Sequence, residues 1–293
     1  MFTESGFHSD DYWAMGGTQK RIDENEVILD DFGRLRCVAN MHESLEWLSK
    51  QTKKSLSQMS PSTVVKLKEI PITIINEMTE QQFFTNLHQE MCRNIEALQD
   101  TANTCLLMLH LEIRVHCFYY VLNTLHNQFN SSTNLTVDEG ILKLNKSLVQ
   151  FHELCTLNLQ KRKVNYIFEG LGHLLSAIFI NCCQNMQKLN DQAKKRLASD
   201  LFHVQQCLSG LTRNAEPDLD SARQFFALLY KNTPEEILDD IVRKTGPRFK
   251  ELDYQNLLAL FVRSHPIYGN EPGTLEKYSI RLREIMVDTR RLQ

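Results

Sequence analysis

Hydrophobic residues in the middle of the chain recur with helical spacing and fall on two flanks of one helix. At the helical step of about 100° per residue, the first flank contains Leu107, Leu111, Val115, Phe118, Leu122 and Leu125. The second flank, about 160° away by the same step, contains Leu106, Leu109, Ile113, Cys117 and Tyr120. Because a surface helix carries a single apolar stripe, two stripes predict a helix that is packed on both sides.

This helix extends well beyond its centre. The segment Thr79 to Gln82 has capping-box form, with Thr79 as the N-cap and Gln82 reaching back to it. No proline or glycine occurs from there to Gln128. The pattern predicts one very long helix, or two helices joined by a slight bend near Asp100–Asn103.

Other segments carry the same helical period. Arg34–Met59 is predicted to be helical because apolar residues recur there at steps of three and four, namely Leu35, Val38, Met41, Leu45 and Leu48. Thr233-Pro234-Glu235-Glu236 starts a helix with an N-cap threonine, a proline at the first helical position and a glutamate at the third. Further helices are predicted over Ile141–Leu159, the apolar stretch Tyr166–Met186, Lys194–Leu211, Asp218–Tyr230, Phe249–Ser264 and Thr274–Arg290.

These patterns predict an all-α protein of about eight to ten helices without strands, and short loops favour antiparallel neighbours. We expect stacked antiparallel helical bundles that form an elongated rod. The expected divisions are a disordered segment at 1–33, a helix with a Pro-containing linker at 34–78, a bundle with the long central helix at 79–212, and a C-terminal bundle at 213–293.

Composition narrows the class of protein. The 293 residues are 42% hydrophobic and 24% charged, as is ordinary for a folded protein, and the net charge of −3 predicts no general attraction to nucleic acid. The first 31 residues lack the apolar run of a secretory signal. None of the eight cysteines forms a C-x-x-C pair, so we interpret them as reduced core residues, with a disulfide framework or zinc site as the alternative.

The sequence contains parts of catalytic motifs but no complete one. His42-Glu43 and His152-Glu153 begin a zinc-protease motif that neither completes. On the central helix, His110 with Arg114 and Glu112 with His116 are i,i+4 pairs; a proton relay is one interpretation, and side-chain pairs between packed helices are the other. We therefore predict no enzyme, no catalytic, cofactor-binding or metal-binding residues, and no cofactor.

Glycines and basic residues carry no clearer motif. Gly170-Leu171-Gly172 lacks the third glycine of a dinucleotide-binding loop, so we expect it to allow a close helix approach or a kink. Three short basic clusters, at Lys161–Lys163, Lys194–Arg196 and Arg281–Arg291, are interpreted as solvated helix faces.

Three segments, in the same order and spacing, resemble the exocyst complex component 4 family. They are Leu109–Tyr119 (LHLEIRVHCFY), Tyr166–Ser176 (YIFEGLGHLLS) and Leu219–Phe226 (LDSARQFF). Ser44–Leu48 (SLEWL) is similar to a stretch just upstream, and the resemblance covers roughly residues 34–293. It implies the C-terminal helical-bundle region of a vesicle-tethering subunit. This chain is expected to begin beyond the family's long N-terminal region, as a fragment or short isoform.

The resemblance implies a non-catalytic exocyst subunit that tethers secretory vesicles to the plasma membrane before fusion. The implied partners are other exocyst subunits, with small GTPases and anionic lipid acting through the assembled complex; no nucleic acid and no small-molecule substrate are expected. The implied location is cytoplasmic, with peripheral recruitment to plasma-membrane sites of exocytosis. Some family members end in a motif for PDZ domains, and Arg291-Leu292-Gln293 does not match it, so that partner is not carried over.

Two alternatives come from other classes of protein. A helical signalling adaptor that binds short peptides would show a concave groove with clustered Arg and Lys side chains. An enzyme built in the helical core would bring Glu112, His116 and His173 together in a solvent-open site.

Overall fold

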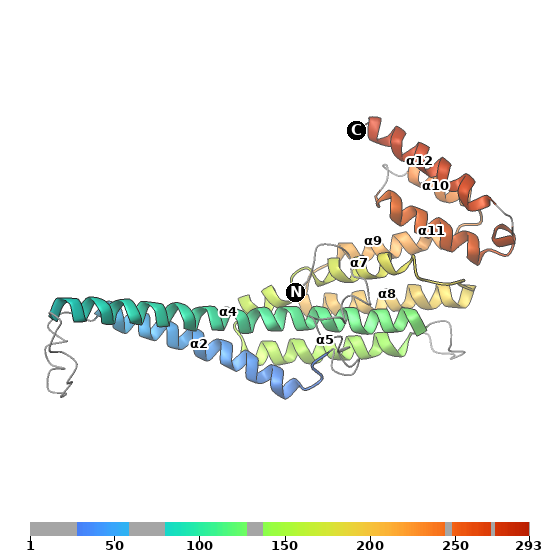
Figure 1. The fold of residues 1–293 in the computed structure, drawn as a ribbon. Helices are drawn as coiled ribbons and strands as arrows, with labels where there is room; N and C mark the ends of the chain where they lie inside the picture. Colours follow the sequence, from blue (N-terminus) through green and yellow to red (C-terminus); the bar gives the residue numbers. More distant parts are fainter. Residues whose placement is uncertain (1–27, 59–79, 128–136, 244–247, 271–272, 293) are drawn as a thin grey trace, which may run out of the picture. The chain divides into compact units, whose positions relative to one another are not determined.

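The computed structural model describes residues 28–58, 80–127, 137–243, 248–270 and 273–292. Every regular element in these ranges is helical, which confirms the all-α class (Figure 1). The helices are α2 (Phe32–Gln58), α4 (Glu80–Asn127), α5 (Glu139–Asn158), α6 (Lys161–Phe168), α7 (Leu171–Cys182), α8 (Asp191–Thr212), α9 (Pro217–Ala227), α10 (Pro234–Arg243), α11 (Glu251–Ser264) and α12 (Thr274–Leu292), with short 3-10 segments η4 (Leu228–Tyr230) and η5 (Tyr268–Asn270).

The described chain forms two compact units, and α4 contributes to both because it packs on different helices along its length. We call residues 29–112 with 151–167 the α2 unit, and residues 113–150 with 168–293 the C-terminal unit. These limits differ from the divisions expected at 78/79 and 212/213. The segments 1–33, 34–78, 79–212 and 213–293 remain a sequence-based prediction of domains, as does their arrangement in a rod.

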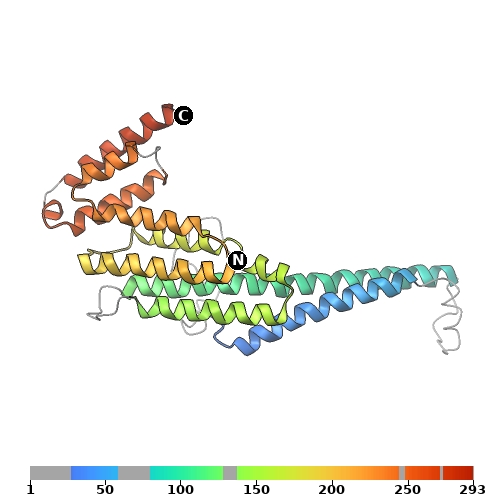
Figure 2. The ribbon, with the colours of Figure 1, turned by 180° about the vertical axis from the view of Figure 1, so that it is seen from behind.

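In the α2 unit, α2 lies along the first part of α4 in the opposite direction (Figures 1 and 2). His42 Nδ1 lies 2.7 Å from the carbonyl oxygen of Ala102, and the Ser49 hydroxyl donates to the carbonyl oxygen of Ile95 at 3.4 Å. Residue numbers therefore rise along α2 as they fall along α4, which is the antiparallel arrangement expected for bundle neighbours.

The C-terminal unit is built on the second part of α4 and on α5, α7 and α8. His116 Nδ1 of α4 lies 2.6 Å from the Ser147 hydroxyl of α5, and both residues are buried. The carboxylate of Asp200, on α8, accepts a hydrogen bond from the backbone N–H of Asp138 at 2.8 Å. Apolar side chains from each helix fill the core, among them Leu144, Leu148, Phe179, Leu201 and Phe225.

Local signals explain where several helices begin and end. The Thr233 hydroxyl accepts a hydrogen bond from the Glu236 N–H at 3.3 Å, which confirms the predicted N-cap of α10. Gly170 has φ +73 and separates α6 from α7, so the stretch Tyr166–Met186 contains two helices. A Cβ on Gly172 would lie 2.1 Å from the Glu216 carboxylate, so this glycine permits the close approach that was expected.

The two apolar flanks of α4 are covered unequally. The second flank is inside, because Leu109, Ile113 and Cys117 are fully buried. On the first flank Leu125 is buried, Leu111, Val115, Phe118 and Leu122 are half-buried, and Leu107 is 46% exposed. The prediction that α4 is packed on both sides is therefore correct for its second half. It is wrong at Leu107, where the described helices cover only one side of α4.

The long central helix is confirmed as one element of 48 residues. The predicted N-cap at Thr79, the linker after Met59 and the disordered segment before Ile28 lie outside the described residues. Residues 28–33 of the expected disordered segment are described, and they are ordered: Ile28 is buried and Phe32 begins α2.

Candidate interaction surfaces

The residues of the hypothetical helical-core enzyme have separate environments. Glu112 accepts a hydrogen bond from the Leu29 N–H at 2.6 Å, and His116 contacts Ser147 in the core. The His173 side chain is 77% exposed and lies 3.5 Å from Asp218. Each of these groups therefore has its own neighbour, and no common solvent-open site forms from them. Among the residues that the structure describes, no cluster of His, Cys, Asp or Glu could hold a metal ion.

The remaining polar residues of the central stretch contact carbonyl groups near the α6–α7 break. The His110 ring stacks on Tyr166 with centroids 4.6 Å apart, and its Nδ1 lies 3.1 Å from the carbonyl oxygen of Tyr166. The Arg114 guanidinium donates to the carbonyl oxygen of Glu169 at 2.5 Å. These polar groups attach the turn between two helices, which is a packing role.

Two of the three basic clusters are less solvated than expected, whereas Arg281 and Arg283 of the third are exposed as predicted. Lys163 lies 2.7 Å from both Glu43 and Glu46 of α2, with a side chain that is largely buried, and Arg196 is also buried. Burial raises the pKa of Glu46, but hydrogen bonds and charges from Lys163 and Lys50 outweigh it and hold that pKa below its ordinary value. The cluster at 161–163 therefore binds α6 to α2.

Asp200 is a buried acid that the sequence analysis did not single out. Burial raises the pKa of its carboxyl group from 3.8 to about 7; the Asp138 charge adds to this, while the Asp138 N–H, Arg196 and His203 oppose it. The helical spacing could have indicated its burial. Asp200 stands three residues after Leu197 and four before Val204, so it shares a helix face with these two buried residues.

The cysteines behave as core residues. All eight are free, and Cys105, Cys117, Cys155, Cys182 and Cys183 are buried. Burial raises the pKa of the Cys117, Cys155, Cys182 and Cys183 thiols to about 12, so these groups stay protonated and unreactive at neutral pH. This supports the interpretation of reduced structural cysteines.

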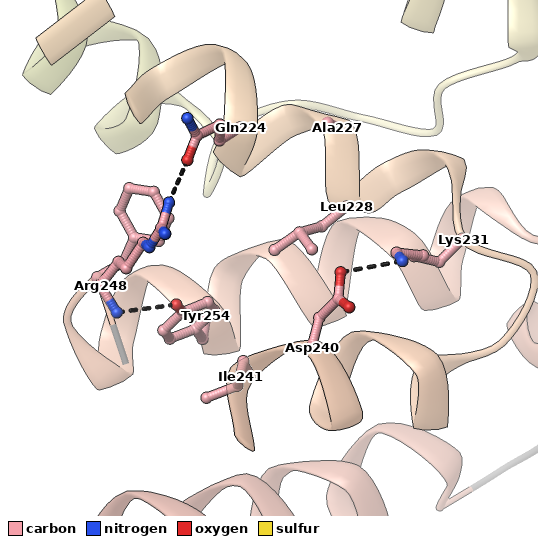
Figure 3. A pocket seen from close by; sticks show the side chains of 9 residues that line it. Gln224, Ala227, Leu228, Lys231, Asp240, Ile241, Arg248 and Tyr254 are labelled. Atoms are coloured by element: carbon pink, nitrogen blue, oxygen red, sulfur yellow. Dashed lines mark hydrogen bonds and ion pairs between the residues drawn. The ribbon is translucent and has the colours of Figure 1, made fainter. Parts of the chain in front are cut away.

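A hollow of about 540 Å³ lies between the end of α9, α10 and the start of α11 (Figure 3). Leu228, Ile241 and Phe249 supply apolar walls. At its two ends lie Lys231, which pairs with Asp240 at 2.9 Å, and Arg248, which donates to the side-chain amide of Gln224.

This hollow has the size of a small-ligand site but not its chemistry. A ligand site has a few convergent polar groups aimed inward, whereas here the polar groups at the rim bond to one another (Figure 3). The peptide-adaptor alternative predicts a groove lined by a cluster of Arg and Lys side chains. This hollow is lined by only two of them, Lys231 and Arg248, so it is not such a groove.

One segment within the described residues, Thr85–Leu125 of α4, is long and apolar enough to cross a membrane, with a hydropathy of 1.4. The core helix of a bundle passes the same test of length and composition. Along this segment Glu112 and His116 contact Leu29 and Ser147, so its polar positions are used within the fold. These contacts favour the core-helix interpretation.

Exposed apolar side chains gather on α2. Met41, Trp47 and Leu48 are 48%, 62% and 43% exposed. The residues that α2 buries are instead Leu35, Ala39, His42, Ser49 and Leu56. The sequence pattern therefore identified the helix correctly, but the buried face is not the one that carries most of the pattern.

Taken together, the described residues define an all-helical bundle protein in which polar groups such as His116, Asp200 and Lys163 bond between packed segments. No family model matches the chain. Curated relatives named exocyst complex component 4 do align with nearly all of it: the human protein is 35% identical over 294 residues, which is 98% of this chain and 29% of the relative.

The match extends to distant animals. The Caenorhabditis elegans protein of the same name is 35% identical, covering 92% of this chain and 30% of the relative, and the Drosophila melanogaster protein is 31% identical, covering 89% and 26%. The chain belongs to the exocyst complex component 4 family, and it spans less than a third of the length of these relatives.

Proposed function

We propose that this chain acts as a non-catalytic part of an exocyst subunit, which helps to hold secretory vesicles at the plasma membrane before fusion. The alignment with exocyst complex component 4 along 98% of the chain is the observation that carries the proposal. The polar groups support it, since His116 and Lys163 join packed helices and Glu112 binds the backbone just before α2.

The mechanism that follows is mechanical. Paired long helices such as α2 and α4 resist bending better than loops do, so exposed positions on them keep fixed spacings for neighbouring subunits. In this proposal the chain works in the cytoplasm and reaches the plasma membrane through the assembled complex. Small GTPases and anionic lipid act on that complex through its other members.

Affinity purification of the tagged chain from cells tests the proposal. Recovery of other exocyst subunits, above the level seen with an unrelated helical protein carrying the same tag, is the expected result. Absence of every exocyst subunit from the purified material would contradict membership. A secretion assay in cells depleted of the endogenous subunit then tests tethering, with vesicles within one vesicle diameter of the plasma membrane counted by electron microscopy.

A further inference from the structure

Two serines of the chain, Ser57 and Ser199, have a lysine or arginine three positions before them, and no threonine does. This is the spacing that basic-directed serine kinases select. A kinase cleft binds its acceptor segment extended, so a residue three positions before the serine lies about 10 Å from it. Carboxylates of the cleft can bind a cation there. Both the serine and the cation must therefore be accessible, and the structure separates the two candidates on this point.

At Ser199 neither the serine nor the cation is accessible. The basic residue is Arg196, which is only 8% exposed, and Ser199 itself is half-buried. Ser199 lies inside α8, away from both ends of the helix, and its hydroxyl lies 3.5 Å from His203 Nδ1 on the next turn. To present this serine to a kinase, α8 would have to unwind around the buried side chains of Leu197 and Leu201.

At Ser57 the serine lies at a helix end. Ser57 is exposed in the last turn of α2, which ends at Gln58. Its hydroxyl donates to the carbonyl oxygen of Lys54, within the same turn, at 2.7 Å. Helix ends open at a lower free energy than helix interiors do, and opening this turn removes a single buried side chain, Leu56, from the core. The Ser57 segment can therefore become extended at much lower cost than the Ser199 segment.

The cations that precede Ser57 are also accessible. Lys53 and Lys54 stand four and three positions before it, and both are exposed. Within the described residues neither of them forms an ion pair, whereas Lys50, one turn earlier, pairs with Glu46 at 3.1 Å. We propose that Ser57 is a phosphorylation site for a basic-directed serine kinase, which selects it through Lys53 and Lys54.

The modification changes the charge at this end of α2. With ATP as the donor, Ser57 Oγ forms a bond to the γ-phosphorus as the bond to ADP breaks, and the hydroxyl proton passes to the catalytic carboxylate of the kinase. The new phosphate carries about −1.5 to −2 charges at neutral pH. Residues three and four apart are neighbours on a helix, so the phosphate pairs with Lys53 and Lys54 and cancels their positive charge.

The first experiment measures phosphate on the full tagged chain, purified from cells treated with a phosphatase inhibitor. Mass spectrometry of its peptides should find phosphate on Ser57 and at least tenfold less on Ser199. Lys53→Ala with Lys54→Ala should lower the phosphorylated fraction at Ser57 about tenfold, because the kinase loses both cations.

A matched control removes two cations elsewhere. Arg281→Ala with Arg283→Ala changes side chains that are 66% and 65% exposed on α12, and it should leave phosphorylation of Ser57 unchanged. Circular dichroism should show the same helix content in both double variants, so that a loss of phosphate reports on recognition and not on unfolding.

A second experiment tests the class of kinase with purified components. The chain is incubated with ATP and the catalytic domain of calmodulin-dependent protein kinase II, which selects a basic residue three positions before its acceptor. Phosphate should appear on Ser57, and Ser57→Ala should remove that signal.

Each other outcome overturns the inference. Absence of phosphate from Ser57 in the chain from cells would show that this serine is not a site, whatever the purified kinase does. Equal phosphorylation of Ser199 would show that burial does not separate the two serines. An unchanged level in the lysine variant, or an equal loss in the arginine variant, would show that Lys53 and Lys54 do not select the site. Phosphate on Ser57 in cells but not with the purified kinase would exclude the basic-directed class.

Discussion

Replacing Asp200 with Asn should make the C-terminal unit more resistant to rising pH. The Asp200 carboxyl group is fully buried on α8 and accepts the Asp138 N–H, and burial raises its pKa from 3.8 to about 7. The folded chain therefore keeps this proton at pH values where the unfolded chain has lost it. The resulting stability is present below the unfolded pKa and is lost as the pH rises through about 7. In the Asp200→Asn variant the side-chain amide carbonyl would still accept the Asp138 N–H but would not titrate.

The magnitude follows from the two pKa values. At about 1.4 kcal/mol per pKa unit, the change from 3.8 to about 7 amounts to about 4 kcal/mol between the protonated and ionised limits. Most of the unfolded-state ionisation occurs below pH 5, so the part that falls between pH 5 and pH 8 is about 2.5 kcal/mol. The unmodified chain should lose this much stability over that range relative to Asp200→Asn.

Amide hydrogen exchange measured on peptides from α5 and α8 checks this without requiring the whole chain to unfold in one step. The difference in opening free energy between the two proteins should grow from pH 5 to pH 8, with Asp200→Asn the more protected at the alkaline end. Asp288→Asn, an exposed change on α12, is the control and should show no such trend. A difference that stays constant with pH would refute the reasoning, since an ordinary packing effect does not titrate.

Three further changes test the packing. Leu109→Ala should lower the free energy of unfolding by about 3 kcal/mol in urea titrations, while Leu107→Ala, on the partly exposed flank, should change it by less than about 0.5 kcal/mol. Similar losses in the two variants would contradict the conclusion that the two flanks of α4 are covered unequally. Gly140→Ala places a Cβ 2.1 Å from Thr124 Oγ1 and should lower the free energy of unfolding by roughly 1–3 kcal/mol. In a protein that already carries Thr124→Ala, the same change should have no effect. If the effects of the two substitutions simply add in thermal unfolding, the clash is excluded. Lys163→Met should cost roughly 2 kcal/mol at pH 7. The cost should shrink as the pH falls below 4.5, the ordinary pKa of glutamate, because the lowered pKa of Glu46 contributes stability that is lost as Glu46 takes up its proton; a cost in denaturant titrations that is independent of pH would count against these ion pairs.

Periodicity predicted the helices well because the residues that determine a helix lie next to one another in the sequence. The proline and glutamate that follow Thr233 start α10 where expected, and the absence of proline and glycine gives α4 as one helix. Which helices touch which could not be read in this way. Lys163 looks like part of a solvated basic cluster until α6 is placed beside α2, and Asp200 looks like an ordinary surface acid until α5 is placed on α8. Such contacts join residues more than 60 positions apart, and no local pattern records them.

The orientation of α2 is the most informative departure from the sequence pattern. A hydrophobic pattern predicts that the most apolar face is buried, because burial of apolar area is the largest favourable term in folding. Here His42 and Ser49 face α4, and Met41 and Leu48 do not. The contacts of His42 and Ser49 with the carbonyl oxygens of Ala102 and Ile95 set the rotation of α2 about its own axis. Buried polar groups that need partners have therefore fixed which face of α2 is inside, at the cost of leaving Met41 and Leu48 partly exposed.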